Sequence, residues 1–226
     1  AADSTVTELD GVNGILRYYE EQGVGYPIGP ALVPIVGGAV IFDLLVGDLK
    51  ARPDGDAGYA ACQAASTDPQ VGAVGAGTGA SVAKGGAMSE FRPGGLGIAS
   101  APAGPAMVSA IMVANSVGGI WDDQLHAWVA PLTSWDRASP LLPGGNTTIG
   151  VVVTDAKLSK EQANRIAMVA HDGIARTVRP AHTLYDGDTV FCLATGPAAA
   201  PYDAVEAVAT DLVAQAIASG VRAAQV

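Results

Sequence analysis

The residues with the clearest chemical potential lie where a loop meets a predicted strand. Asn146 and Thr147 follow a loop rich in proline and glycine, residues 131–145, and lead into an apolar strand expected over 149–154. If the bond between Asn146 and Thr147 breaks, Thr147 gains an α-amine with a reference pKa of about 8, which is partly neutral at pH 7. A threonine hydroxyl activated by its own amine is a known nucleophile–base pair. The junction therefore indicates a self-cleaving site, and the alternative interpretation is a plain turn before a strand.

A pair of carboxylates stands before another predicted strand. Asp186 and Asp188 precede residues 189–194, and side chains two residues apart in an extended chain point to the same face. Such a pair can orient an amine and a hydroxyl. The alternative is that Asp186-Gly187-Asp188 forms only a tight turn.

Two other polar residues interrupt apolar or glycine-rich surroundings. Lys84 lies in the otherwise uncharged run 72–86, where it is either a solvated loop residue or a cation placed at a site. Asn115 follows the apolar strand expected over 107–113. A strand-end amide can donate a hydrogen bond to an oxyanion, or it can cap a turn.

Cofactor chemistry finds little support in the sequence. Residues 75–80 fit G-x-G-x-x-A, but the following Lys84-Gly85-Gly86 breaks the helix that a dinucleotide fingerprint requires, so a glycine loop is expected. The two cysteines are 130 positions apart, which excludes a cysteine-based zinc motif. The histidines lack metal-ligand spacing and are expected to be surface or structural residues: His126, His171 and His182. We therefore expect no metal ion and no organic cofactor.

Composition narrows the class of protein further. The 226 residues are 49% hydrophobic and 15% charged, which suits one folded domain of medium size. The net charge of −10, with 12 scattered basic residues against 22 acidic ones, argues against nucleic-acid and anionic-membrane partners. No apolar run approaches the roughly 18 residues of a transmembrane helix, and a cytoplasmic location is the simplest expectation.

Hydrophobic periodicity predicts a mixture of helices and strands. Helices are expected over 4–21, 58–66, 159–178 and 201–219, and strands over 40–45, 95–100, 107–113, 149–154 and 189–194. Several strands are almost wholly apolar, as in sheets buried on both faces. The order of elements favours an α+β domain, or a layered α/β/α domain, with no internal boundary.

Capping residues suggest where three of these helices begin or end. Ser4 or Thr5 is expected to cap the first helix, and Ser159 with Gln162 forms a capping box for the third. Gly220 is expected to end the last helix as its C-cap.

These motifs resemble the DmpA-type aminopeptidase family, which includes the nylon-oligomer hydrolases. The most specific block is Gly145-Asn146-Thr147-Thr148-Ile149, continuing into 153–156. The second block is 179–183 followed by 186–191. The segments 40–44 and 113–118 are also similar to the family, and the resemblance extends from Val12 to near the C-terminus.

The resemblance implies a fold like that of N-terminal nucleophile hydrolases, with a central sheet covered by helices. It implies one hydrolase domain that cleaves itself into residues 1–146 and 147–226, which stay associated and form a homo-oligomer. In this family pattern Thr147 is the nucleophile, Lys84 the site lysine and Asn115 the oxyanion-stabilising amide. Asp186 and Asp188 match the acidic pair near the nucleophile.

The sequence departs from the family pattern at one substrate-binding position and at its N-terminal end. Phe42 stands where nylon-oligomer hydrolases carry a substrate-binding tyrosine, so a hydroxyl is lost there. Family members also have further strands upstream of the position of Ala1.

The function that the resemblance implies is hydrolysis of short peptides, amino-acid amides or ω-amino-acid oligomers through an acyl-enzyme on Thr147. The alternatives are an ornithine-acetyltransferase-like enzyme and an uncleaved, non-catalytic relative.

Overall fold

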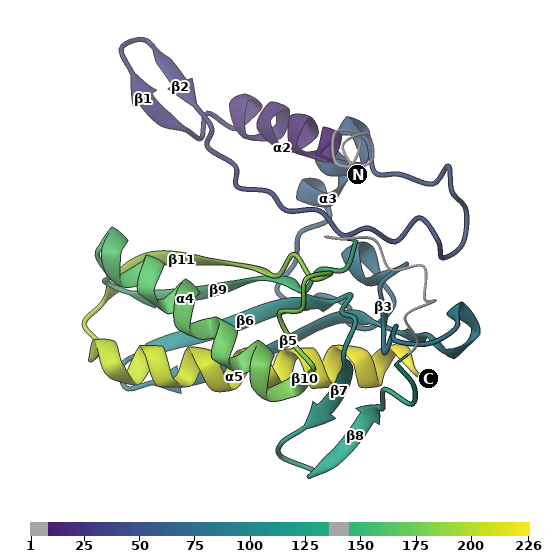
Figure 1. Ribbon diagram of the computed structural model, residues 1–226. Helices are drawn as coiled ribbons and strands as arrows, with labels where there is room; N and C mark the ends of the chain where they lie inside the picture. Colours follow the sequence, from purple (N-terminus) through teal and green to yellow (C-terminus); the bar gives the residue numbers. More distant parts are fainter. Residues whose placement is uncertain (1–8, 136–144) are drawn as a thin grey trace. The chain divides into compact units, whose positions relative to one another are not determined.

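The computed structural model describes residues 9–135 and 145–226, which group into two compact units (Figure 1). Of the described residues, the smaller unit contains 9–40 together with 44–70. The larger unit contains 41–43, 71–135 and 145–226 and holds all the candidate site residues.

The smaller unit is a helix pair with a short hairpin. Helix α2 spans Asp10–Glu21 and α3 spans Gly55–Gln63, while strands β1 (Tyr26–Ile28) and β2 (Ala31–Val33) pair antiparallel. The expected caps Ser4 and Thr5 lie outside the described residues, and Leu9 occupies the N-cap of α2. Helix α3 begins three residues earlier than predicted because the Asp54 side chain accepts the Ala57 N–H.

The backbones of α2 and α3 approach closely at glycines. A Cβ atom built on Gly14 would collide with the Gly55 carbonyl, and one built on Gly58 would collide with the Gly11 carbonyl. The absence of side chains at these two positions therefore sets the distance between the helices.

The larger unit is built on a four-stranded sheet with the order β11–β9–β6–β5. Its strands are β5 (Gly95–Ala103), β6 (Ala106–Ala114), β9 (Ile149–Ala156) and β11 (Thr189–Ala198). Strand β11 runs parallel to β9, and the other two pairs are antiparallel. All four strands were predicted from their Val- and Ile-rich runs.

Helices α4 (Lys160–Thr177) and α5 (Tyr202–Ala224) lie on the same face of this sheet (Figure 1). Helix α5 packs along β5 and β6, while α4 packs against β11 and α5. The predicted capping box of Ser159 and Gln162 is confirmed. Side chains between the layers are fully buried, among them Met112, Val152, Ile166, Ile174, Leu212 and Ile217.

The prediction that Gly220 ends the last helix is wrong. Helix α5 continues to Ala224, and Gly220 lies inside it, against the backbone of Gly97 on β5. A Cβ at either glycine would meet backbone atoms of the other element, so Gly220 serves packing rather than termination. By length and composition α5 could cross a membrane, yet 56% of its most apolar window is buried inside the molecule, as in core helices of globular domains.

The remaining strands are short. Strands β7 (Gly119–Asp122), β8 (Ala127–Ala130) and β10 (Val178–Arg179) form a small sheet, and β3 (Ser81–Val82) pairs with β4 (Arg92–Pro93). The sequence did not predict them. The strand expected over 40–45 does not form, and this apolar segment has no ladder partner in the part of the chain that the structure describes. The α+β class itself is confirmed.

Candidate active site

The junction of Asn146 and Thr147 is buried and clamped by a neighbouring loop. Asn146 forms an isolated parallel bridge with Asp186: its N–H donates to the Tyr185 carbonyl over 3.1 Å. The carbonyl oxygen of Asn146 accepts the N–H of Gly187 over 2.6 Å. Only 5% of Thr147 is exposed. The bond expected to be cut is therefore held by backbone hydrogen bonds on both sides, just before β9.

The Thr147 nitrogen and the Lys84 ammonium meet at one acceptor. The backbone N–H of Thr147 donates to the Asn115 carbonyl over 2.8 Å, and Lys84 Nζ donates to the same oxygen over 3.1 Å. Lys84 Nζ also donates to Asn115 Oδ1 over 2.8 Å. Three residues separated by more than 30 positions from one another are thus in contact around a single peptide group.

The side-chain amide of Asn115 is fixed in orientation. Its Oδ1 accepts from both Lys84 and the Ser81 N–H, the latter over 3.0 Å, so this atom is the oxygen. Its Nδ2 donates to the Phe42 carbonyl over 3.1 Å. Phe42 therefore touches the site through its backbone, and the role of its ring in substrate binding stays a prediction.

Burial makes Lys84 easy to deprotonate. Only 4% of the residue is exposed, and the loss of hydration lowers the pKa of its ammonium from 10.5 to about 7, against the attraction of Asp186 and Asp43. Burial also raises the pKa of the Asp43 carboxyl. A lysine in this setting exists in both protonation states near neutral pH.

The two predicted carboxylates take different partners. Asp188 Oδ1 accepts the Thr148 N–H over 2.7 Å, next to the candidate nucleophile. Asp186 Oδ1 accepts the Val117 N–H over 3.1 Å, and its Oδ2 accepts the Thr183 N–H and hydroxyl over 3.0 and 2.6 Å. Both acids precede β11 rather than lying on it, and both fix backbone segments around the junction.

The sequence as a whole matches the model of peptidase family S58 over residues 3–226. The chain belongs to this family.

Relatives of this S58 family member carry two kinds of name. A protein of Mycobacterium tuberculosis named as an uncharacterized aminopeptidase is 42% identical over an alignment of 252 residues, which covers 96% of this chain and 71% of the relative. The 6-aminohexanoate-oligomer endohydrolase of Agromyces is 31% identical, with 82% of this chain and 56% of that protein covered.

The solved structures define the fold. The L-aminopeptidase D-Ala-esterase/amidase of Ochrobactrum anthropi, described as a variant of the Ntn hydrolase fold, superposes with a TM-score of 0.69 at 21% identity. The match covers 96% of this chain and 63% of that one. The S58 family member therefore has an Ntn-hydrolase fold, as predicted, and it spans about three fifths of the length of this solved relative.

Sequence reasoning missed two groups in the site. The Gly187 N–H contacts the Asn146 carbonyl, and a Cβ at Gly187 would lie 3.1 Å from Thr147 Oγ1. His182 Nδ1 lies 2.6 Å from Asp188 Oδ2. Both residues belong to the second family motif, but a backbone donor and a ring orientation depend on packing that the sequence does not display.

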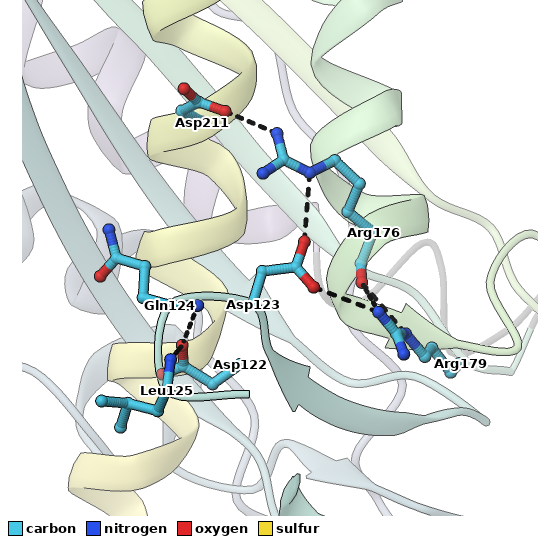
Figure 2. A network of polar contacts seen from close by, with 7 residues as sticks. All are labelled: Asp122, Asp123, Gln124, Leu125, Arg176, Arg179 and Asp211. Carbon is cyan, nitrogen blue, oxygen red and sulfur yellow. Dashed lines mark hydrogen bonds and ion pairs between the residues drawn. The ribbon is translucent and has the colours of Figure 1, made fainter. Parts of the chain in front are cut away.

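A second polar cluster joins the β7–β8 turn to helices α4 and α5 (Figure 2). Arg176 on α4 pairs with Asp211 on α5 and with Asp123 after β7, and Arg179 also pairs with Asp123. Asp123, Arg176 and Asp211 line a cavity of about 330 Å³ whose lining includes none of the predicted site residues. The cluster ties the β7–β8 turn to both long helices.

Across residues 9–135 and 145–226, no three His, Cys, Asp or Glu side chains are grouped so that they could hold an ion. Residues 75–77 form a short 3-10 helix within the glycine loop.

Proposed function

We propose that this chain carries the active site of a self-processing amide hydrolase with Thr147 as its nucleophile. One observation supports the proposal above all: the Asn146 carbonyl accepts the Gly187 N–H over 2.6 Å, beside the Thr147 hydroxyl. A fixed N–H donor stabilises the negative charge that develops on a carbonyl oxygen when its carbon is attacked. The precursor thus holds its own scissile bond in a polarised state.

Self-cleavage proceeds by transfer of the acyl group from nitrogen to oxygen. Thr147 Oγ1 attacks the Asn146 carbonyl carbon, and neutral Lys84 is the candidate acceptor of the hydroxyl proton. That proton passes to the Thr147 nitrogen as the carbon–nitrogen bond breaks and an ester forms. Water then hydrolyses the ester, which leaves a carboxylate on Asn146 and a free amine on Thr147.

Turnover repeats this chemistry on an external amide. The neutral Thr147 amine takes the hydroxyl proton, Oγ1 attacks the substrate carbonyl, and the leaving amine departs with a proton. Water releases the acyl group from the resulting ester. Asn115 and protonated Lys84 supply hydrogen-bond donors for the charged intermediate, while Asp186 and Asp188 hold the surrounding backbone.

The relatives' names support one substrate class over another. An aminopeptidase name at 42% identity and an oligomer endohydrolase name at 31% favour short peptides and amino-acid amides over nylon-type oligomers. The loss of the tyrosine hydroxyl at Phe42 points the same way. Assays with aminoacyl anilides, 6-aminohexanoate oligomers and acetylornithine as acyl donor separate hydrolase, oligomer hydrolase and acyl transferase.

An intact mass spectrum under denaturing conditions tests the proposal. Wild-type protein should give two species that meet between Asn146 and Thr147. Thr147→Ala should remain one uncut, inactive chain, whereas Thr147→Ser, which keeps a hydroxyl, should still be cut. A single uncut wild-type species, or substantial turnover by Thr147→Ala, would overturn the assignment.

A further inference from the structure

His182 and Asp188 form a close pair beside the junction. The imidazole Nδ1 lies 2.6 Å from Asp188 Oδ2, and the carboxylate side chain is only 4% exposed while that of the histidine is 37% exposed. An ionised carboxylate can only accept, so Nδ1 carries the proton. The buried Asp188 carboxylate therefore accepts a charge-assisted hydrogen bond from the partly exposed imidazole of His182.

The second oxygen of the Asp188 carboxylate binds the backbone of Thr148, the residue after the candidate nucleophile. Asp188 Oδ1 accepts the Thr148 N–H over 2.7 Å, while the Thr148 carbonyl accepts the Thr189 N–H over 3.0 Å. A rotation of the Asp188 carboxylate would release the backbone immediately after Thr147. The histidine ring, by holding Oδ2, opposes that rotation.

The backbone of His182 is bent to make this contact. Its φ of 54° lies in the left-handed region, which is uncommon for residues other than glycine and is maintained only where the surroundings enforce it. On the other side its ring lies 5.1 Å from the ring of His171 on α4, centroid to centroid. The imidazole is therefore confined between a helix and the carboxylate.

We infer that His182 is a positioning residue for Thr147, acting through Asp188 and the Thr148 N–H. The inference rests on the proposed function, because it assigns a role in orienting that nucleophile. His182 reaches the reacting atoms only through this chain of two hydrogen bonds, so it positions rather than reacts. Partners that orient metal-bound histidines typically account for about 10- to 100-fold in activity, and we expect a loss of similar size here.

The test compares two variants that both suit the left-handed backbone. Asparagine and glycine tolerate a positive φ, but only asparagine keeps an N–H donor close to the position of Nδ1. His182→Gly should lower kcat about tenfold or more with little change in KM and slow self-cleavage, and His182→Asn should recover most of the loss. His126→Gly is the matched control, because His126 is also left-handed (φ 49°) but lies exposed in the β7–β8 turn.

The outcomes separate this inference from the proposed function. Wild-type protein that neither cuts itself nor turns over substrate defeats the proposed function. Active wild type with an equally active His182→Gly, or with His182→Asn as slow as His182→Gly, overturns the positioning role. If His182→Gly fails to fold, His182→Leu replaces it, since Leu has the branched shape of Asn without the donor and adds no charge beside Asp188. The role then requires His182→Leu to be at least tenfold slower than His182→Asn.

Discussion

The charge of Lys84 is costly to the fold because the ammonium is buried. Its burial lowers the pKa from 10.5 in the unfolded chain to about 7, so the unfolded state binds more protons between these two values. The free energy of unfolding therefore rises with pH across that window. Below about pH 7 Lys84 is charged in both the folded and the unfolded chain, so folding bears the full cost of desolvating the ammonium. Above pH 10.5 the lysine is neutral in both states, and this cost is gone.

This dependence of stability on pH predicts that the wild type and Lys84→Met respond differently to pH. Relative to Lys84→Met, the free energy of unfolding of the wild type should increase between pH 7 and 10 by up to about 1.4 kcal/mol per pH unit. Denaturant unfolding at several pH values measures it. Lys157→Met, at an exposed position, is the control and should run parallel to the wild type. Parallel curves for the wild type and Lys84→Met would show that burial does not shift this pKa.

Individual site residues were predictable to different degrees. Asn146 and Thr147 stand out locally, because hydroxyl residues rarely lead a proline-rich loop into a core strand. Lys84 and Asn115 stand out in the sequence as an isolated cation and a strand-end amide, but only the family resemblance links both of them to Thr147. Gly187 contributes a backbone N–H and His182 a ring turned by a left-handed backbone. Neither property can be derived from residue type.

At the scale of elements, the strongest local patterns were reliable. Helix α4, with its capping box, and strands β5, β6, β9 and β11 follow from periodicity and β-propensity. Residues 40–45 have the same propensity, but tertiary packing gives the Phe42 carbonyl to the Asn115 side chain instead of a ladder. Strands β7 and β8 have four residues each, too few for alternation to distinguish them from loop.

The glycines of α2 give an element-scale prediction. A Cβ at Gly14 would collide with backbone atoms of Gly55 and Tyr59 on α3, whereas one at Gly11 would meet only the Asp54 oxygen at 3.8 Å. Gly14→Ala should therefore destabilise the helix pair by about 1–3 kcal/mol. Gly11→Ala should stabilise it by up to about 1 kcal/mol, because alanine loses less backbone entropy in a helix.

Hydrogen exchange of the α2 and α3 amides measures both changes within the smaller unit. Protection should fall in Gly14→Ala and rise or stay equal in Gly11→Ala. Equal protection in the two variants would mean that the helices do not approach each other through Gly14.

At the scale of the whole molecule, the chain order interleaves the two expected fragments. Strands β5 and β6 belong to residues 1–146, while β9, β11 and both long helices belong to 147–226. Strand β9 pairs with β6 over six positions, from Val108–Thr154 to Val113–Ile149, and α5 packs on β5 and β6. Cleavage after Asn146 would thus cut one peptide bond and leave a shared sheet and a shared core intact.

The cleaved fragments should consequently stay together until the core unfolds. On size-exclusion chromatography in native buffer both should elute in one peak with the apparent size of Thr147→Ala, and they should separate only in denaturant. Dissociation requires exposing the apolar face between β6 and α5, a cost of roughly 25 cal/mol for each Å² uncovered. Release of either fragment under native conditions would contradict the paired register of β6 and β9, because that ladder joins the fragments once the peptide bond is cut, together with the α5 contacts, the β7–β10 pair and the ion pairs of Asp123.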